Sequence, residues 1–236
     1  MNELVEGLLR MTPSTTLSVV VPIHKHHSKL ETIRQAVRTS PIPAELIIVV
    51  NDPQLEEPIH SSERVVRCLR RGRGFAFVIG IHYARGNVIL LLHADTVLPH
   101  DWSTAIMQVL QNEQCVGGGF SLTFDRSNLF LKLLVRLSHI RFHITGVMFG
   151  DRAMFARADI LNNCLTCMKV PLFEDLRLSQ CLRRHGTTVL LRTHVTTSAA
   201  SFHMRGMWKH LLRIVKCQLW YALGGDLERI FHYYYS

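Results

Sequence analysis

The chain has 236 residues, of which 47% are hydrophobic and 19% charged, so it can bury a core and is not a disordered tail. Its 27 Lys and Arg outnumber its 18 Asp and Glu, which gives a formal net charge of +9. This charge favours an anionic partner, namely nucleic acid, a phosphorylated small molecule or an acidic membrane surface, although a basic surface without a partner has the same value.

The first half of the sequence alternates between short apolar runs and helical patterns. One helical pattern places Leu30, Ile33 and Val37 on a single face, and Ser28 with Glu31 before it fits a capping box. The expected strands are 17–23, 45–50, 64–67 and 87–92, and the expected helices are 28–38 and one that opens at 71–74 and runs to Ala84. This alternation predicts a parallel, doubly wound α/β sheet.

The second half contains a Gly-rich turn leading to a strand at 117–124, a strand-like segment after 150–151 and a helix that Gly186 ends. It also contains two amphipathic stretches, 128–140 and 204–223. In the first, the apolar face is Leu129, Phe130, Leu133, Leu134 and Leu137, and the polar face is Lys132, Arg136 and His139. In the second, the apolar stripe is Met204, Trp208, Leu211, Leu212, Val215 and Leu219, flanked by Arg205, Lys209, Arg213 and Lys216.

Two kinds of segment are missing from the sequence. The N-terminal residues lack the apolar stretch of a signal peptide, and no uncharged run reaches the ~18 residues of a membrane span.

The six cysteines are scattered, unlike those of a disulfide-stapled protein. Cys164 and Cys167 could bind zinc or act in redox chemistry, but two half-buried thiols beside a helix end are the simpler interpretation. We therefore expect a reduced, cytoplasmic protein.

Polar side chains follow the expected strands at the edge where such sheets bind ligands. Asp95 comes directly after the run 87–92, where a carboxylate can hold Mg²⁺ or Mn²⁺ against a diphosphate, with His93 as a second ligand or hydrogen-bond partner. The alternative is that Asp95 caps a following helix or turn. Asp52 ends another run, and it either accepts a hydrogen bond from a nucleobase or ribose, or forms an Asx turn before Pro53.

Three further clusters have both a functional and an ordinary interpretation. Basic side chains beside two glycines at a helix start suit a phosphate, or form a solvated basic face; they are Arg70, Arg71 and Arg73. Glu174 and Asp175 begin a helix, where the helix dipole alone favours acids, but one of them can act as a general base for an attacking hydroxyl. His24, His26 and His27 could bind a metal, or lie in a solvated loop.

Taken in order, these segments resemble the family 2 glycosyltransferases, which have a GT-A fold. The matching segments are LSVVVPI, ELIIVVND, RGRG with its helix, GNVILLLHADTVLP, GDRAMFARADIL, VPLFEDLRLSQCLRRHG and VTTSA, so the similarity runs from about Leu17 to Tyr234. The sequence is most similar to the bacterial branch that has HAD in place of D-x-D. The resemblance implies an α/β protein with a GT-A (Rossmann-like), mostly parallel sheet flanked by helices, followed by C-terminal amphipathic helices.

The resemblance also implies one glycosyltransferase-like domain, with an N-terminal extension (1–16), a nucleotide-binding half (17–112), an acceptor and catalytic half (113–203) and a helical segment (204–236). We expect a nucleotide-diphosphate sugar donor and a divalent cation, Mn²⁺ or Mg²⁺.

The family's motifs further imply roles for individual residues. The cation would be bound by Asp95, with His93 as a second ligand. Asp175 would deprotonate the acceptor hydroxyl in an inverting displacement, with Glu174 beside it and Asp151 facing the acceptor. The residues expected to contact the donor are Pro22, His24, Asp52, Arg71, Arg73 and Ala94.

The first two loops depart from the family pattern, because Pro-x-x-Asn-Glu is replaced by PIHKH and the glycine after Asp52 by Pro53. A catalytically degenerate relative that binds a nucleotide sugar is therefore the alternative function. No nucleic-acid partner is expected, since no binding motif or aromatic platform is present.

The amphipathic stretches carry a last expectation. Their apolar faces should pack on the protein's own core, as a stripe at helical spacing usually does. Their basic rims predict weak, salt-sensitive, peripheral binding to anionic lipid at the inner face of the cell membrane, which would suit a lipid-linked acceptor.

Overall fold

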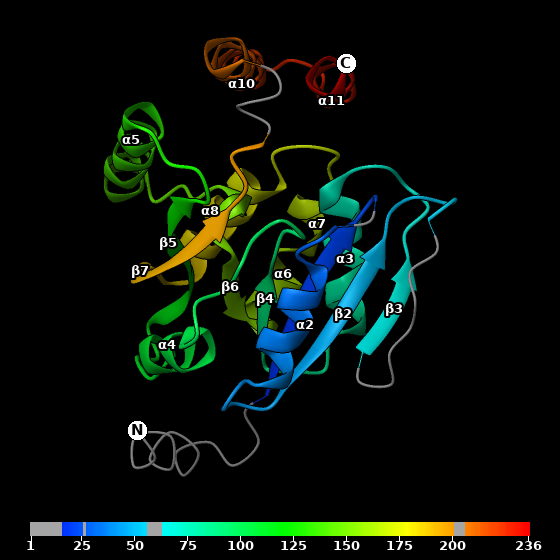
Figure 1. The fold of residues 1–236 in the computed structure, drawn as a ribbon, viewed down its shortest axis with the longest axis vertical. Coiled ribbons are helices and arrows are strands. Elements are labelled where there is room, and N and C mark those ends of the chain that lie inside the picture. Colours follow the sequence, from blue (N-terminus) through cyan, green and yellow to red (C-terminus); the bar gives the residue numbers. More distant parts are fainter. Residues whose placement is uncertain (1–15, 26, 56–62, 201–205) are drawn as a thin grey trace.

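The computed structural model describes residues 16–25, 27–55, 63–200 and 206–236. Its strands are β1 (Leu17–Ile23), β2 (Ala44–Val50), β3 (Glu63–Arg67), β4 (Val88–Leu91), β5 (Cys115–Phe124), β6 (Met154–Arg157) and β7 (Thr187–Thr197). Within these residues they form one seven-stranded sheet in the order β3-β2-β1-β4-β6-β5-β7 (Figure 1). Strand β6 runs antiparallel to its neighbours β4 and β5, and the other pairs are parallel. The expected mostly parallel sheet is confirmed.

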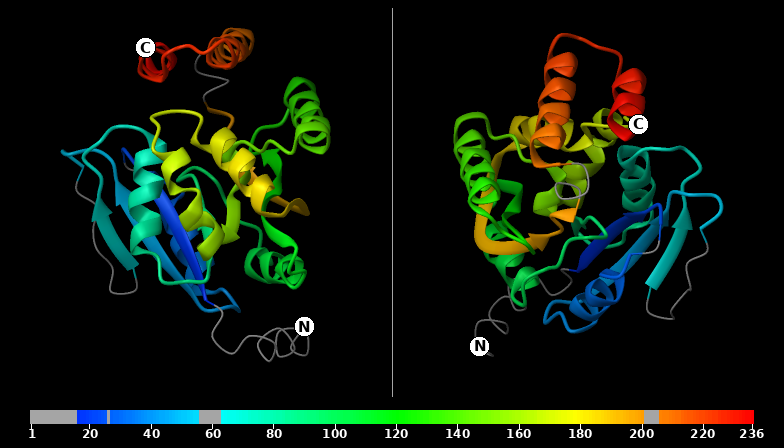
Figure 2. Two further views of the ribbon diagram at one scale, coloured as in Figure 1. Left: turned by 180° about the vertical axis from the view of Figure 1, so that it is seen from behind. Right: turned by 45° about the horizontal axis from the view of Figure 1, so that its top comes forward.

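Helices cover both faces of the sheet (Figures 1 and 2). They are α2 (Leu30–Arg38), α3 (Arg73–Tyr83), α4 (Trp102–Leu110), α5 (Leu129–Thr145), α6 (Ala158–Asn163), α7 (Leu165–Met168), α8 (Glu174–His185), α10 (Met207–Ala222) and α11 (Leu227–Tyr235), with a 3₁₀ turn η1 (Gly150–Arg152) before β6. Helices α10 and α11 lie at the end of the molecule to which β1 and β2 point. Among the described residues, we find no helix with the length and apolar character needed to cross a membrane.

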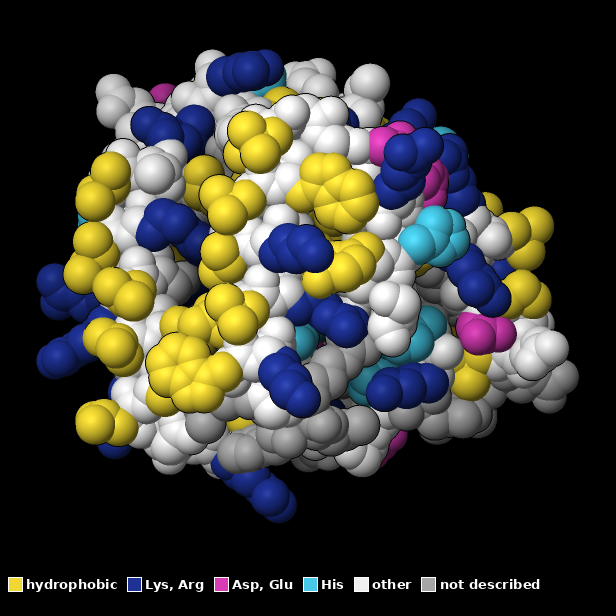
Figure 3. Space-filling view, turned by 90° about the horizontal axis from the view of Figure 1, so that it is seen from above, with side chains coloured by type: hydrophobic (Ala, Val, Ile, Leu, Met, Phe, Trp, Pro, Cys, Tyr) yellow, Lys and Arg dark blue, Asp and Glu magenta, His cyan; other side chains and the backbone are white. Residues whose placement is uncertain are grey.

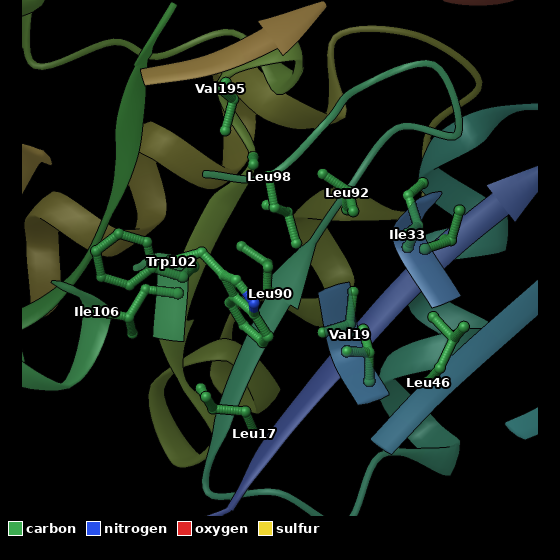
Figure 4. Packing of buried hydrophobic residues seen from close by; sticks show 14 of the residues in the cluster. Leu17, Val19, Ile33, Leu46, Leu90, Leu92, Leu98, Trp102, Ile106 and Val195 are labelled. Carbon is green, nitrogen blue, oxygen red and sulfur yellow. The ribbon is translucent and has the colours of Figure 1, made fainter. Parts of the chain in front are cut away.

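The central strands are apolar on both sides because each side packs against helices. Val19 and Leu90 belong to the core shared with α2 and α4, which includes Trp102 (Figure 4). Val20 and Leu91, their neighbours along the chain, belong instead to the core shared with α3, α6, α7 and α8. This double coverage is the physical reason for the unbroken apolar runs in the sequence.

The loop after β4 is fixed against the end of β7. A hydrogen bond from the Thr96 amide to the His93 carbonyl (3.0 Å) closes a turn. Val97 then forms an antiparallel bridge with Thr196, and the hydroxyls of Thr96 and Thr197 lie 3.3 Å apart. The HADT and VTTSA segments, a hundred residues apart in sequence, therefore lie side by side at the carboxyl ends of the strands.

Two local expectations are wrong. The capping box does not form, because α2 begins at Leu30 with Lys29 as its N-cap and no side-chain cap, although Leu30, Ile33 and Val37 are buried as expected. The apolar faces of the two amphipathic stretches do not pack on the core. Helix α5 buries only two of its side chains, Leu131 and Phe142, and most large apolar side chains of α10 are exposed or half-buried. Met204, Arg205, His26 and residues 1–15 of the expected extension lie outside the described residues.

The expectation of fully reduced cysteines is also wrong. Cys164, between α6 and α7, forms a disulfide with Cys181 of α8, and their Cα atoms are 5.9 Å apart. That separation lies within the range a disulfide can bridge. Cys167, the other member of the Cys-x-x-Cys pair, is a half-buried free thiol, as expected. The Cys-x-x-Cys spacing points to Cys164 and Cys167. The packing of α8 on α6 and α7 instead brings Cys181 to Cys164.

Candidate active site

A cavity of about 460 Å³ opens beyond the carboxyl ends of the central strands. It brings together Arg73 of α3, Asp151 of η1 and Asp175 of α8 with two residues that follow β4, His93 and Asp95. These five side chains come from four separate parts of the chain. Five of the expected site residues therefore share one cavity.

Asp95 lies in the turn after β4, and its carboxylate faces the cavity. His93 stacks its ring on Phe77, with the ring centroids 6.1 Å apart. Burial, together with the positive charge of Arg73, lowers the pKa of His93 well below its ordinary value, so the imidazole is neutral at pH 7. Its Nε2 atom is buried without a hydrogen-bond partner among the described residues. A neutral, unpartnered imidazole nitrogen next to a carboxylate can ligate a metal ion.

Asp175 and Glu174 begin α8, but they face different surroundings. The helix starts after Phe173, whose φ of 64° is unusual for a residue other than glycine. Asp175 lines the cavity, and its Oδ1 accepts a hydrogen bond from the Leu176 amide at 2.7 Å. Glu174 is not among the lining residues and is only 2% exposed; its Oε1 lies 3.0 Å from Nε of Arg73.

The ion pair of Arg73 and Glu174 lacks the hydrogen bonds that would fully offset the cost of burying the carboxylate. Neither carboxylate oxygen of Glu174 has a hydrogen bond of good geometry among the described residues. Burial and, to a smaller extent, the charge of Asp175 raise the pKa of Glu174 to about 7, against the opposing effect of Arg73. Burial lowers the pKa of Arg73, but the acidic groups around it, Glu174 first, together outweigh burial and raise that pKa. Glu174 therefore holds Arg73 in place at the cavity wall.

Glycines allow α3 to approach the segment that precedes α8. Gly72 has a φ of 121°, and a Cβ there would lie 2.6 Å from Cα of Pro171. A Cβ on Gly74 would collide with the carbonyl oxygens of Met168 and Val170. The RGRG motif thus makes a close backbone contact that positions Arg73 opposite Glu174.

Asp151 lines the cavity, and Arg152 follows it in the turn η1. The guanidinium of Arg152 is buried and donates to the carbonyl of Phe120 (3.2 Å) and to Oγ of Ser138 (2.8 Å). Burial raises the pKa of Asp151; Arg152 opposes this shift and Asp175 adds to it. Ala153, the next residue, has a φ of 48°, so strained backbone lies beside Asp151 as it does beside Asp175.

The other expected donor contacts, Pro22, His24, Asp52, Arg71 and Ala94, are not among the residues that line the cavity. Oδ1 of Asp52 accepts from the Gln54 amide at 2.8 Å, which is the Asx turn considered as the alternative. Arg71 is exposed and Ala94 is buried. His24 is exposed, and its ring centroid lies 5.9 Å from that of His27.

Sequence reasoning missed residues that shape the site. Asn51 donates to the carbonyls of Cys68 (3.0 Å) and Arg70 (2.7 Å) and accepts from the Gly72 amide (3.2 Å), so it ties the loop before α3 to the end of β2. Its position before Asp52 at a strand end was the available signal. Arg141 lines the cavity with its guanidinium 3.8 Å from the centroid of Phe149, but it lies just beyond the helix boundary that the sequence suggested.

Comparison with known proteins agrees with this architecture. Residues 13–211 match the family described as "Glycosyltransferase like family 2". No curated protein matches the chain. A crystal structure of a mycobacterial protein is similar, with a TM-score of 0.61 and 16% identity over 94% of this chain and 79% of the other.

Glucosyl-3-phosphoglycerate synthase from Mycobacterium tuberculosis shares the fold as well. Its complex with Mn²⁺, UDP-glucose and phosphoglyceric acid has a TM-score of 0.59 and 15% identity over 94% of this chain and 84% of the other. Its complex with Mg²⁺ and UDP has a TM-score of 0.53 and 15% identity over 82% and 74%. The family match covers most of the chain and the GT-A fold is shared, so this protein belongs to glycosyltransferase-like family 2 and is a glycosyltransferase.

Proposed function

We propose that the protein moves a sugar from a nucleotide-diphosphate donor to an acceptor hydroxyl, in a metal-dependent reaction that inverts the anomeric carbon. The observation that carries the proposal is the cavity that collects Asp95, Asp151 and Asp175 with His93 and Arg73. Carboxylates for a cation and a base, and an arginine for a diphosphate, are the groups this reaction needs. The solved structures of similar fold that contain UDP with Mn²⁺ or Mg²⁺ support the same donor class.

The residues after β4 fit a divalent cation. Asp95 offers carboxylate oxygen, and His93 offers a buried neutral nitrogen that has no partner among the described residues. The diphosphate of the donor and water would supply the remaining ligands of a cation held by Asp95 and His93. When bound, Mn²⁺ or Mg²⁺ would stabilise the negative charge that develops on the leaving diphosphate.

Asp175 is the residue we assign as general base. It would accept the proton of the acceptor hydroxyl while the hydroxyl oxygen bonds to the anomeric carbon and the bond from that carbon to the diphosphate breaks. A single displacement of this kind inverts the configuration. Asp175 begins α8, where the helix dipole stabilises a carboxylate. Asp151, which also lines the cavity, is the next candidate. Arg73, held by Glu174, would contact the departing phosphate.

A catalytically degenerate nucleotide-sugar-binding protein is the second candidate. The observation that favours it is the Asx turn of Asp52 before Pro53, because one of the two carboxylate oxygens, Oδ1, already accepts from the Gln54 amide. The two candidates differ in turnover: both bind the nucleotide, but only the transferase releases UDP from a sugar donor when an acceptor is present.

The side chains that line the cavity indicate which kind of acceptor it could bind. Besides the carboxylates, it is lined by apolar side chains of α5 and α10, among them Leu134, Val135, Leu211 and Ile214. A hydroxyl attached to an apolar group, as in a lipid-linked acceptor, would match this wall. We place the enzyme in the cytoplasm at the inner face of the cell membrane. Disulfides are rare in that compartment, so the bond between Cys164 and Cys181 would be an exception there.

Calorimetry tests the proposed function. UDP, GDP and CDP are titrated into the protein with and without Mn²⁺, and at least one should bind in a Mn²⁺-dependent manner. Asp95→Asn should weaken that binding by at least ~10-fold, whereas Asp159→Asn, which changes an exposed acid on α6, should not. Absence of Mn²⁺-dependent binding for all three nucleotides would contradict both candidates. Equal affinity of Asp95→Asn and wild type would remove Asp95 from the site.

A further inference from the structure

Two helices beside the cavity present apolar stripes to solvent. On α5 the stripe consists of Leu129, Leu133, Leu137, Ile140 and Ile144, and on α10 of Trp208, Leu212, Val215 and Leu219. Trp208 is 67% exposed and Leu129 is 85% exposed. These residues recur every three or four positions, a pattern that normally marks a buried helix face. An exposed apolar surface of this extent usually marks an interaction site.

The two stripes belong to one surface. The ring of Phe130 at the start of α5 packs on that of Trp208 at the start of α10, with centroids 4.9 Å apart. Figure 3 looks onto this end of the molecule and shows hydrophobic side chains gathered there with Lys and Arg between them. We call the exposed residues of α5 and α10 the α5–α10 surface.

The charge of the α5–α10 surface identifies what it binds. Neither helix contains Asp or Glu, and both carry exposed basic side chains, including Lys132 and Arg136 on α5 and Lys209 and Lys216 on α10. Protein interfaces are depleted in lysine, and a second copy of the chain would place this basic surface against itself. Apolar side chains between lysines and arginines instead match a bilayer with anionic headgroups, in which apolar groups enter the acyl region and cations meet phosphate.

The same surface is continuous with the cavity. Leu137 and Val215 are both exposed on the α5–α10 surface and line the cavity that contains Asp95 and Asp175. Leu172 and Phe173, which lead into α8, form a small core with Cys217 of α10 and Ile230 of α11, so α10 is fixed beside the catalytic acids. A molecule held in the bilayer could therefore reach the cavity directly.

We propose that the α5–α10 surface docks the protein on an anionic lipid bilayer and that the cavity faces that bilayer to receive its acceptor. This rests on the proposed function for the role of the cavity, but the docking itself does not depend on catalysis. Each exposed lysine adds electrostatic attraction, and each exposed leucine adds apolar area that the bilayer can bury.

Flotation of the full chain with lipid vesicles tests the docking. The protein should float with vesicles of phosphatidylglycerol and phosphatidylcholine at low salt and stay in solution with phosphatidylcholine alone. The bound fraction should fall by at least ~10-fold near 0.5 M salt, because screening weakens the contribution of the lysines. Lys132→Glu with Lys209→Glu should abolish flotation. Arg38→Glu with Arg85→Glu changes the charge equally at exposed positions outside α5 and α10 and should retain it.

Fluorescence quenching tests separately whether the apolar side chains of the α5–α10 surface enter the bilayer. Trp208 should be quenched by phosphatidylcholine brominated in its acyl chains, mixed with phosphatidylglycerol, and Trp208→Phe should lose most of the quenching. Trp102 is 1% exposed and cannot contact the quencher. Leu133→Ser with Leu212→Ser should reduce flotation while leaving the melting temperature nearly unchanged, because both side chains are exposed in the folded protein.

Several outcomes would overturn the proposal. The first is absence of flotation with anionic vesicles. The second is an equal loss of flotation when Lys132 and Lys209, or Arg38 and Arg85, are replaced by Glu. The third is absence of Trp208 quenching. A dimer in sedimentation experiments that Lys132→Glu with Lys209→Glu disrupts would assign the surface to a second copy instead. Mn²⁺-dependent UDP binding is measured on the same samples. If the protein binds UDP but does not float with vesicles, only the docking is refuted. If the protein floats with vesicles but binds no nucleotide, the proposed function is refuted and the docking is supported.

Discussion

Replacing Glu174 by Gln should stabilise the protein at neutral and alkaline pH. The carboxyl is 2% exposed, neither oxygen has a well-formed hydrogen bond among the described residues, and its pKa is raised from 4.5 to about 7 by burial. The folded protein therefore binds more protons than the unfolded chain between these two values. The contribution of Glu174 to stability must fall as the pH rises through that window, because the charged form is the one that burial disfavours.

The size of the effect follows from the shift in pKa. About 2.5 pKa units at 1.36 kcal/mol per unit give about 3 kcal/mol as the upper bound on the stability lost between pH 4.5 and pH 7. Gln has the shape of the protonated acid and does not titrate. Glu174→Gln should match wild type near pH 5 and exceed it near pH 8 by up to this amount.

Urea unfolding from pH 5 to pH 8 measures this difference. The difference in stability between Glu174→Gln and wild type should grow as the pH rises, because only the wild type carries the titration of Glu174. Glu113→Gln, at an exposed position after α4, is the matched control and should reproduce the wild-type curve. The competing view is that Arg73 dominates, in which case breaking a buried ion pair costs 3–5 kcal/mol. A Gln variant less stable than wild type at pH 8 would refute our reasoning.

Three further substitutions test other parts of the site. Asp175→Asn should lower turnover by ~10²-fold with nearly unchanged nucleotide affinity, and normal turnover would move the base to Asp151. Gly74→Ala should cost about 1–3 kcal/mol in urea unfolding, because its methyl group collides with the carbonyls of Met168 and Val170; a neutral result would mean that α3 shifts freely. Asn51→Ala should cost about 1–3 kcal/mol in the same assay through the lost anchors of the loop before α3, and an unchanged midpoint would contradict this role.

The sequence alone determined the order of the central elements. The runs 17–23, 45–50 and 87–92 are short and mostly apolar because helices cover both faces of the sheet, and this pattern is typical of buried strands. Asp95 stands out as an acid after a buried strand, whereas Asp175 could be chosen only from its place in the order of family motifs, because the helix dipole alone explains acids in a first helical turn. The order of motifs also indicates the family.

Only the tertiary structure decided which groups meet. The pairing of Arg73 with Glu174 depends on two glycines that let α3 approach residues 168–174, and the disulfide of Cys164 depends on the packing of α8. The exposure of the α5 and α10 stripes is also a tertiary result. A helical pattern shows that a face is apolar, but whether the core or a partner covers it depends on how much apolar surface the sheet leaves free, and local sequence does not carry that information.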